Sequence, residues 1–222
     1  MSACRSALLW ALVLFPAALS AQGSPRAGAF EIGGGAGWIG GSPAGDATAS
    51  ETRNQTGVAA LLTLFEADAR LRPTGAYGAR VGFHLTPTTS VEAGFSYSRP
   101  TVAIAVSGDF EDSPDVTIDA SSLRQYVVDL GVVVHLRRLR FGRDGVPFFS
   151  AGAGYLRELT DERALAGTGR VYRIGGGLKQ RLGPRGGLRF DAGLGVRDGG
   201  FSLDEPRLRA FFTAGAGAFL VF

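Results

Sequence analysis

The strongest constraint on the fold is an alternation of apolar residues with period two, which recurs along most of the chain. Over positions 125–136, every second residue is apolar: Tyr126, Val128, Leu130, Val132, Val134 and Leu136. The segments "YGARVGFHL" (77–85), "VEAGFSYS" (91–98) and "LRFDAGLGV" (188–196) repeat this pattern. Successive side chains of a β-strand point to opposite faces of the sheet, so the pattern indicates strands with one apolar face rather than helices.

Eight segments carry this pattern, and the links between them differ in length. The segments are about 29–39, 76–86, 90–107, 117–136, 146–159, 170–182, 187–201 and 208–222. Tight links such as "TPTT" (86–89) contrast with longer, more polar ones, above all a first loop at about 40–75. This predicts an eight-stranded antiparallel up-and-down barrel with short turns at one end and long loops at the other. Within the first loop, 57–75 fits either a helix or an extension of the second strand.

The composition of the polar face of the strands indicates what the apolar face contacts. A soluble lipocalin-like barrel would turn its apolar face inward and expose a charged face to water, whereas a membrane barrel turns the apolar face to lipid. Here the polar face is mostly glycine with isolated charges, and Lys179 is the only lysine of the chain. A water-facing surface is normally rich in lysine and glutamate. We therefore expect the apolar face to contact lipid and the glycine-rich face to line the lumen.

Charges of both signs lie on this expected lumen face. An eight-stranded barrel is only just wide enough for its side chains, so glycines would leave room for long neighbours, and buried charges must be paired. We predict a salt-bridge network that plugs the lumen, formed by Glu31, Arg80, Glu92, Asp129, Arg173, Lys179, Arg189 and Asp191.

The N-terminus has the composition of an export signal. Arg5 precedes the apolar run "ALLWALVLFPAAL" (7–19), and small residues follow. This predicts a cleavable signal peptide at 1–21 and a single barrel domain at 22–222. The only cysteine, Cys4, lies in the signal, so the mature chain can form no disulfide framework.

A glycine-rich stretch near the start of the barrel domain, "FEIGGGAGWIGG" (30–41), contains a G-x-G-x-x-G pattern. A dinucleotide site would need a helix after the third glycine. Residues 41–55 instead contain Pro43 and Gly45 and have the composition of a loop. We interpret the stretch as the first strand of the barrel.

The last strand, "FFTAGAGAFLVF" (211–222), ends in Phe222 with Leu220 on the same face. With the signal peptide and eight alternating strands, the chain resembles small bacterial outer-membrane β-barrels of the OmpA and OmpX type. The resemblance implies that Leu220 and Phe222 form an assembly signal read by the barrel assembly machinery. It also implies a monomer in contact with outer-membrane lipids and lipopolysaccharide. The net charge is only +3 and the arginines are scattered along the chain, so we expect no nucleic-acid partner; no cofactor or metal is expected either. Trp38, Tyr77, Tyr97 and Tyr155 suit an interfacial aromatic belt.

Two histidines, His84 and His135, are the candidates for catalysis, and both are expected to face the lumen. Barrel deacylases place a serine two residues after their histidine, whereas Thr86 and Arg137 stand at these positions here. We therefore expect no enzymatic activity. The interpretation is a structural or adhesive role through extracellular loops; the alternatives are a narrow channel for ions or small solutes, a lipid-modifying enzyme and a soluble carrier.

Overall fold

The computed structural model describes residues 26–53, 60–108, 114–139, 141–142, 144–162, 164–204 and 207–222, so the predicted signal peptide lies outside the described residues. The described residues form twelve strands, and no helix among them is long and apolar enough to cross a membrane. The strands are β1 Phe30–Ile39, β2 Ser42–Arg53, β3 Ala60–Leu71, β4 Thr74–His84, β5 Thr89–Ser98, β6 Thr101–Ser107, β7 Val116–Ser122, β8 Arg124–His135, β9 Gly145–Leu159, β10 Leu165–Arg181, β11 Gly186–Gly199 and β12 Leu208–Val221.

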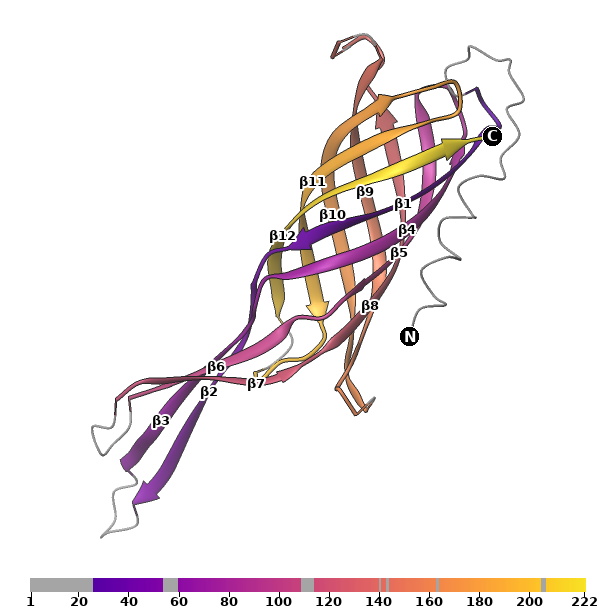
Figure 1. The fold of residues 1–222 in the computed structure, drawn as a ribbon. Helices are drawn as coiled ribbons and strands as arrows, with labels where there is room; N and C mark the ends of the chain where they lie inside the picture. The colour runs from indigo at the N-terminus through magenta and orange to yellow at the C-terminus, as the bar shows by residue number, and fades with distance from the viewer. Residues whose placement is uncertain are drawn as a thin grey trace, which may run out of the picture.

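Eight of these strands close into an antiparallel barrel in the order β1-β12-β11-β10-β9-β8-β5-β4 (Figure 1). The first strand closes the barrel because it pairs with β12 on one side and β4 on the other; Ala36, for example, lies opposite both Ala216 and Tyr77. The predicted eight-stranded antiparallel barrel is therefore confirmed.

The other four strands form a second sheet, β2-β3-β6-β7, which projects beyond one end of the barrel (Figure 1). The barrel's C-terminus and the short β4–β5 and β10–β11 turns lie at the opposite end. Short turns mark the periplasmic end of such barrels, so the second sheet stands on the extracellular side. We call it the extracellular sheet.

Several predicted strand boundaries are wrong where the chain enters or leaves the extracellular sheet. Segments 90–107 and 117–136 are not single strands, because β5 gives way to β6 near Pro100 and β7 gives way to β8 at Leu123. Proline lacks the N–H that a central strand donates, and the partners also change there. In the barrel β5 pairs with β4 and β8, whereas beyond Pro100 β6 pairs with β3 and β7.

The predicted first loop at 40–75 contains two strands, β2 and β3, so the loop interpretation of 41–55 is wrong. Of the two alternatives for 57–75, extension of the second strand is correct, since β3 leads into β4 after Arg72 and Pro73. Glycine, proline and aspartate disfavour strands on propensity alone. Pairing with β3 holds β2 extended despite Pro43, Gly45 and Asp46, with a bulge between Pro43 and Gly45. The link expected at 160–169, between the segments 146–159 and 170–182, is also shorter than predicted, because β10 begins at Leu165.

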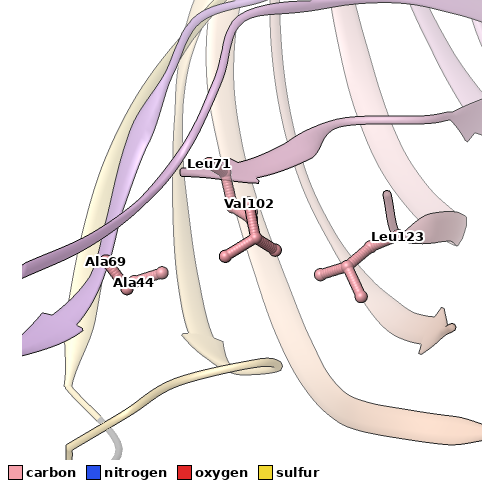
Figure 2. Packing of buried hydrophobic residues seen from close by; sticks show 5 residues of the cluster. All are labelled: Ala44, Ala69, Leu71, Val102 and Leu123. Carbon is pink, nitrogen blue, oxygen red and sulfur yellow. The ribbon is translucent and has the colours of Figure 1, made fainter. Parts of the chain in front are cut away.

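A small apolar cluster fixes the base of the extracellular sheet to the barrel mouth (Figure 2). It is formed by five buried residues, Ala44, Ala69, Leu71, Val102 and Leu123. Ala166 of β10 and Phe201 of the β11–β12 loop pack against them. The sheet is thus tied to the opposite wall of the mouth as well as to the strands that continue into it.

The outward face of the barrel is apolar over its whole circumference. On β8, Val128 and Leu130 are each 60% exposed, and comparable residues occur on every other barrel strand, including Ile32, Val81, Phe95, Phe149, Ile174, Leu194 and Phe212. Trp38, Tyr77 and Tyr155 are exposed in the halves of their strands nearer the extracellular end. Water would not tolerate a continuous apolar belt of this kind, whereas a bilayer requires it. This face contacts lipid.

A charge placed in the middle of this belt should destabilise the barrel according to depth. We expect Leu130→Arg to lower the free energy of unfolding by about 2–4 kcal/mol, and Leu208→Arg, at the extracellular end of β12, by about 0–1 kcal/mol. Urea unfolding of the protein in lipid vesicles measures both values. Equal losses would contradict the lipid-facing assignment, since both leucines are exposed to a similar extent, 60% and 69%.

Candidate functional site in the barrel lumen and mouth

The periplasmic half of the lumen holds a continuous chain of ion pairs. Arg80 Nη1 lies 2.9 Å from Asp191 Oδ1, and Arg189 Nε lies 3.2 Å from the same oxygen. Arg189 Nη1 donates to Glu92 Oε2 at 2.7 Å. Lys179 Nζ lies 3.3 Å from Glu92 and 2.6 Å from Glu31. Three cations therefore face three carboxylates, and the six residues come from five strands, β1, β4, β5, β10 and β11.

The other two residues of the predicted set form a separate pair nearer the middle of the barrel. Arg173 Nη1 donates to Asp129 Oδ2 at 3.0 Å. Between this pair and the chain of ion pairs lies a cavity of about 220 Å³. Arg80, Asp129, Arg173 and Asp191 all contribute to its lining, so these charges balance, although most of the other lining residues are small or apolar.

Three phenylalanines also point into the lumen, which the alternation pattern did not predict. Phe148 and Phe219 are almost fully buried, and Phe211 is partly buried. The Arg189 guanidinium lies 4.4 Å from the centre of the Phe148 ring, and Lys179 Nζ lies 5.5 Å from that of Phe219. Cations over aromatic faces are stabilised by the ring quadrupole. The available signal was the doubled "FF" at 148–149 and 211–212, since alternation must turn one member of each inward.

Glycines opposite these rings explain part of the unusual glycine content. A Cβ added at Gly195 would lie 2.2 Å from the Phe211 ring, and one at Gly177 or Gly187 would lie 2.9 Å from Phe148 or Phe219. Other inward glycines face charged side chains, as expected: a Cβ at Gly94 would lie 2.7 Å from Asp129. The lumen glycines therefore accommodate aromatic rings as well as ionic side chains.

An apolar layer crosses the lumen on the extracellular side of the cavity. Val127, Leu156 and Val171 are buried there from three neighbouring strands, and Phe211 packs against them. The layer is unusual for a barrel interior because it has the composition of a soluble core.

A polar layer caps the mouth above the apolar one. The Gln125 amide donates to Glu158 Oε1 at 2.6 Å, and the backbone N–H of Phe201 donates to Glu158 Oε2. The Arg197 guanidinium contacts Glu158 Oε1 at 3.4 Å and donates to the Pro43 carbonyl at 2.8 Å. These contacts join three barrel strands to the β11–β12 loop and to the extracellular sheet.

The β11–β12 loop is fixed across the mouth by Asp204. The Ser202 hydroxyl donates to Asp204 Oδ1 at 2.5 Å, and Arg209 forms an ion pair with the same carboxylate. The hydrogen bond from Ser202 and the positive charge of Arg209 hold the pKa of Asp204 below its usual value of 3.8. Gly45 of β2 lies against this loop with φ of +103°, where a Cβ would overlap Asp204. Glycine is needed there on both counts.

The two histidines are stacked at the periplasmic end of the lumen. Their ring centres are 5.5 Å apart, and His84 Nε2 lies 3.5 Å from Glu31 Oε2. Ser90 Oγ lies 3.4 Å from His135 Nε2, which is the spacing of a weak hydrogen bond. Ser90 is only 1% exposed and His135 only 6%. A serine nucleophile must reach its substrate, and this pair faces neither lipid nor solvent.

The C-terminal residues lie at the seam of the barrel, on its outward side. Phe222 donates its backbone N–H to the Phe30 carbonyl at 2.8 Å, and Phe30 donates to Phe222 at 3.2 Å. The side chains of Leu220 and Phe222 are 46% and 58% exposed. Both therefore lie on the surface that contacts lipid, at the periplasmic end.

Comparison with solved structures finds similar outer-membrane proteins. The chain is similar to the outer membrane protein OprG from Pseudomonas aeruginosa, with 13% sequence identity, a TM-score of 0.52, and coverage of 89% of this chain and 97% of that one. It is also similar to the N-terminal β-barrel domain of Pseudomonas aeruginosa OprF (14% identity, TM-score 0.45, coverage 89% and 100%). Neisserial surface protein A gives 11% identity, a TM-score of 0.48, and coverage of 87% and 98%.

No protein-family model matches the chain, and no curated protein sequence matches it. At 13% identity, the likeness to OprG shows the fold alone. The fold is that of a small outer-membrane β-barrel, and its closed wall and apolar exterior are built to span a bilayer. The chain is an integral β-barrel protein of the bacterial outer membrane.

Removal of Lys179 should expose how tightly the lumen charges are coupled. Its side chain is 7% exposed and contacts two carboxylates, so Lys179→Met leaves Glu31 and Glu92 without it. We expect a loss of about 3–5 kcal/mol in the free energy of unfolding, because one partner of a buried pair is removed. Arg185→Met, in the exposed β10–β11 turn, serves as the control and should change stability little.

The double variant Glu31→Gln/Lys179→Met should recover part of that loss, since Glu92 keeps its contacts with Arg189. Unfolding by urea in vesicles measures all three variants. If the double variant were less stable than Lys179→Met, neutralising Glu31 would bring no relief, and Lys179 and Glu31 would not be coupled.

Proposed function

We propose that the protein is a closed barrel that holds a rigid β-sheet above the outer membrane as a surface for adhesion. One observation carries this proposal: the extracellular sheet has two chemically distinct faces, and the apolar face is exposed beyond its base. Small barrels need only short links between their strands. Twelve- and seven-residue strands above the membrane therefore indicate a role outside it.

The apolar face follows from the strand register. Ile104 lies opposite both Ala69 and Ile118, and Val106 lies opposite Ala67 and Val116. Near the barrel this face is buried in the cluster that includes Ala69. Farther out it is open, with Phe65 40%, Val116 51% and Ile118 54% exposed.

The opposite face of the sheet is acidic and partly paired. Asp46, Glu66 and Asp68 of β2 and β3 share it with Asp119 of β7. Arg70 and Arg72 pair with Asp68 and Asp119 at 3.0 and 2.7 Å. This face is well suited to water, which leaves the apolar face as the side for contact with another surface.

The side chains that fill the lumen favour a closed barrel over a conducting one. The ion-paired layer with Lys179 and Arg189 occupies the periplasmic half, and the apolar layer with Leu156 and Phe211 crosses the lumen above the cavity. An eight-stranded barrel has room for its side chains and little more. We infer that the lumen is plugged and that the function resides in the extracellular sheet.

The adhesive role can be tested on cells that display the protein. We expect Val116→Thr/Ile118→Thr to reduce attachment to an apolar surface, because burial of each such side chain at a contact contributes about 1.5–3 kcal/mol. Threonine keeps the β-branched shape that suits a strand. The control, Ala105→Ser/Thr117→Ser, changes a cross-strand pair on the acidic face. Attachment equal to wild type in the first variant, at equal surface amounts, would rule out the apolar face as the adhesive surface.

The cavity of about 220 Å³ is the one observation that favours a narrow channel instead. Because layers of different chemistry close it on both sides, we expect the wild-type protein to show no steady conductance in planar bilayers. A steady current that disappears in Arg80→Gln would support the channel and contradict the plugged lumen. That substitution removes a lining cation and its ion pair with Asp191.

A further inference from the structure

Four neighbouring barrel strands carry the same pair of residues on the outer wall. β5, β8, β9 and β10 each present an exposed or half-exposed tyrosine, and an arginine follows two positions away toward the extracellular end. The pairs are Tyr97 and Arg99, Tyr126 and Arg124, Tyr155 and Arg157, and Tyr172 and Arg170. Residues two apart on a strand share a face and lie roughly 6–7 Å apart along it. The tyrosines thus form one tier and the arginines a second tier above it.

The strand register interleaves the tyrosines and arginines on this side of the barrel. Tyr97 lies opposite Tyr126, and Tyr126 lies opposite Arg157. Arg170 lies opposite Tyr155 on the next strand. The strand directions alternate, yet the arginine is on the extracellular side of the tyrosine each time. The sequence order is accordingly Tyr-x-Arg on β5 and β9 and Arg-x-Tyr on β8 and β10.

The arginine tier has more positive charge than its neighbours neutralise. Arg99 lies 2.6 Å from Asp161, and Arg124 shares that carboxylate at 3.9 Å. Arg157 and Arg170 are exposed and form no salt bridge with another residue in the described part of the chain, although Asp198 lies opposite Arg170. Four guanidinium groups therefore face two carboxylates on the wall.

We propose that this surface, Arg157 and Arg170 above Tyr126, Tyr155 and Tyr172, binds the phosphate groups of lipid A in the outer leaflet. Tyrosines occupy the boundary between hydrocarbon and head groups, so the arginines two residues above them lie at the height of the phosphates. Guanidinium groups donate several hydrogen bonds to phosphate in a fixed fork. The tyrosine rings pack against the sugar and the upper acyl chains of the same lipid.

The position of the arginines favours a membrane lipid over a soluble anion. Outward strand positions such as Arg157 and Arg170 alternate with the buried Leu156, Glu158 and Val171, so they open sideways into the leaflet and not into the mouth. The β9–β10 hairpin above them is only five residues long, 160–164, and leaves room for a large head group. The extracellular sheet rises from the other side, through the strands that join β1, β4, β5 and β8.

The test is native mass spectrometry of the full barrel in detergent with three probes: bisphosphorylated lipid A, lipid A with its phosphates removed, and inorganic phosphate. We expect the wild-type protein to retain bisphosphorylated lipid A in preference to the dephosphorylated form. Arg157→Gln/Arg170→Gln should weaken retention about fivefold for each arginine, the effect of one basic residue near an anionic membrane surface. Millimolar inorganic phosphate should not displace the lipid, because it lacks contacts for the tyrosine tier.

A charge-matched control separates a local site from the overall charge of the barrel. Arg138→Gln/Arg185→Gln removes two exposed arginines from the periplasmic turns and should retain lipid A as the wild type does. Heat-modifiability on gels confirms that both double variants are folded. Equal retention by the two double variants, equal retention of phosphorylated and dephosphorylated lipid A, or displacement by inorganic phosphate would each overturn the proposal.

Discussion

The structure depends on closure of the backbone hydrogen-bond ladder between β1 and its two neighbours. Inside a bilayer no water can satisfy a free N–H or C=O, so an open sheet edge would be very costly. The seam between β1 and β12 is built from small residues on both strands, such as Gly35 opposite Gly217 and Ala36 opposite Ala216. A Cβ at Gly35 would lie 2.3 Å from a backbone oxygen of β12. Close approach at this seam is what allows the wall to close.

The backbone hydrogen bonds are under a different constraint where the strands leave the membrane. The extracellular sheet is open, and β2 and β7 are its edges. Water can hydrogen-bond to these edges, so closure is no longer required. What the sheet needs instead is a fixed base, and the cluster of Leu71, Val102 and Leu123 supplies it together with Phe201. One chain thus uses a closed sheet in lipid and an open sheet in water, with Pro73 and Pro100 at two of the four transitions between them.

The alternation in the sequence was sufficient to predict the barrel because each register slip of one residue would turn all apolar side chains inward. Propensity was a poor guide to β2, since its strand structure comes from pairing with β3. The pairing of lumen charges could not be derived either. Arg173 meets Asp129 from 44 positions away only because of the order and register of β8, β9 and β10. Composition identifies a charged lumen face, whereas register decides which charges meet.

The interior combines two kinds of stabilisation that are rarely mixed in so narrow a space. Arg189 contacts Glu92 and Asp191 through its charge while its planar group lies over Phe148. The ring excludes water from the ion pair and thereby strengthens it, since charges attract more strongly in a low dielectric. The Phe148 ring needs space against the barrel wall, and Gly177 provides it because a Cβ at that position would overlap the ring. Glycine, phenylalanine and arginine on three different strands therefore act as one unit, and the glycines that face the lumen follow from the width of the barrel rather than from flexibility.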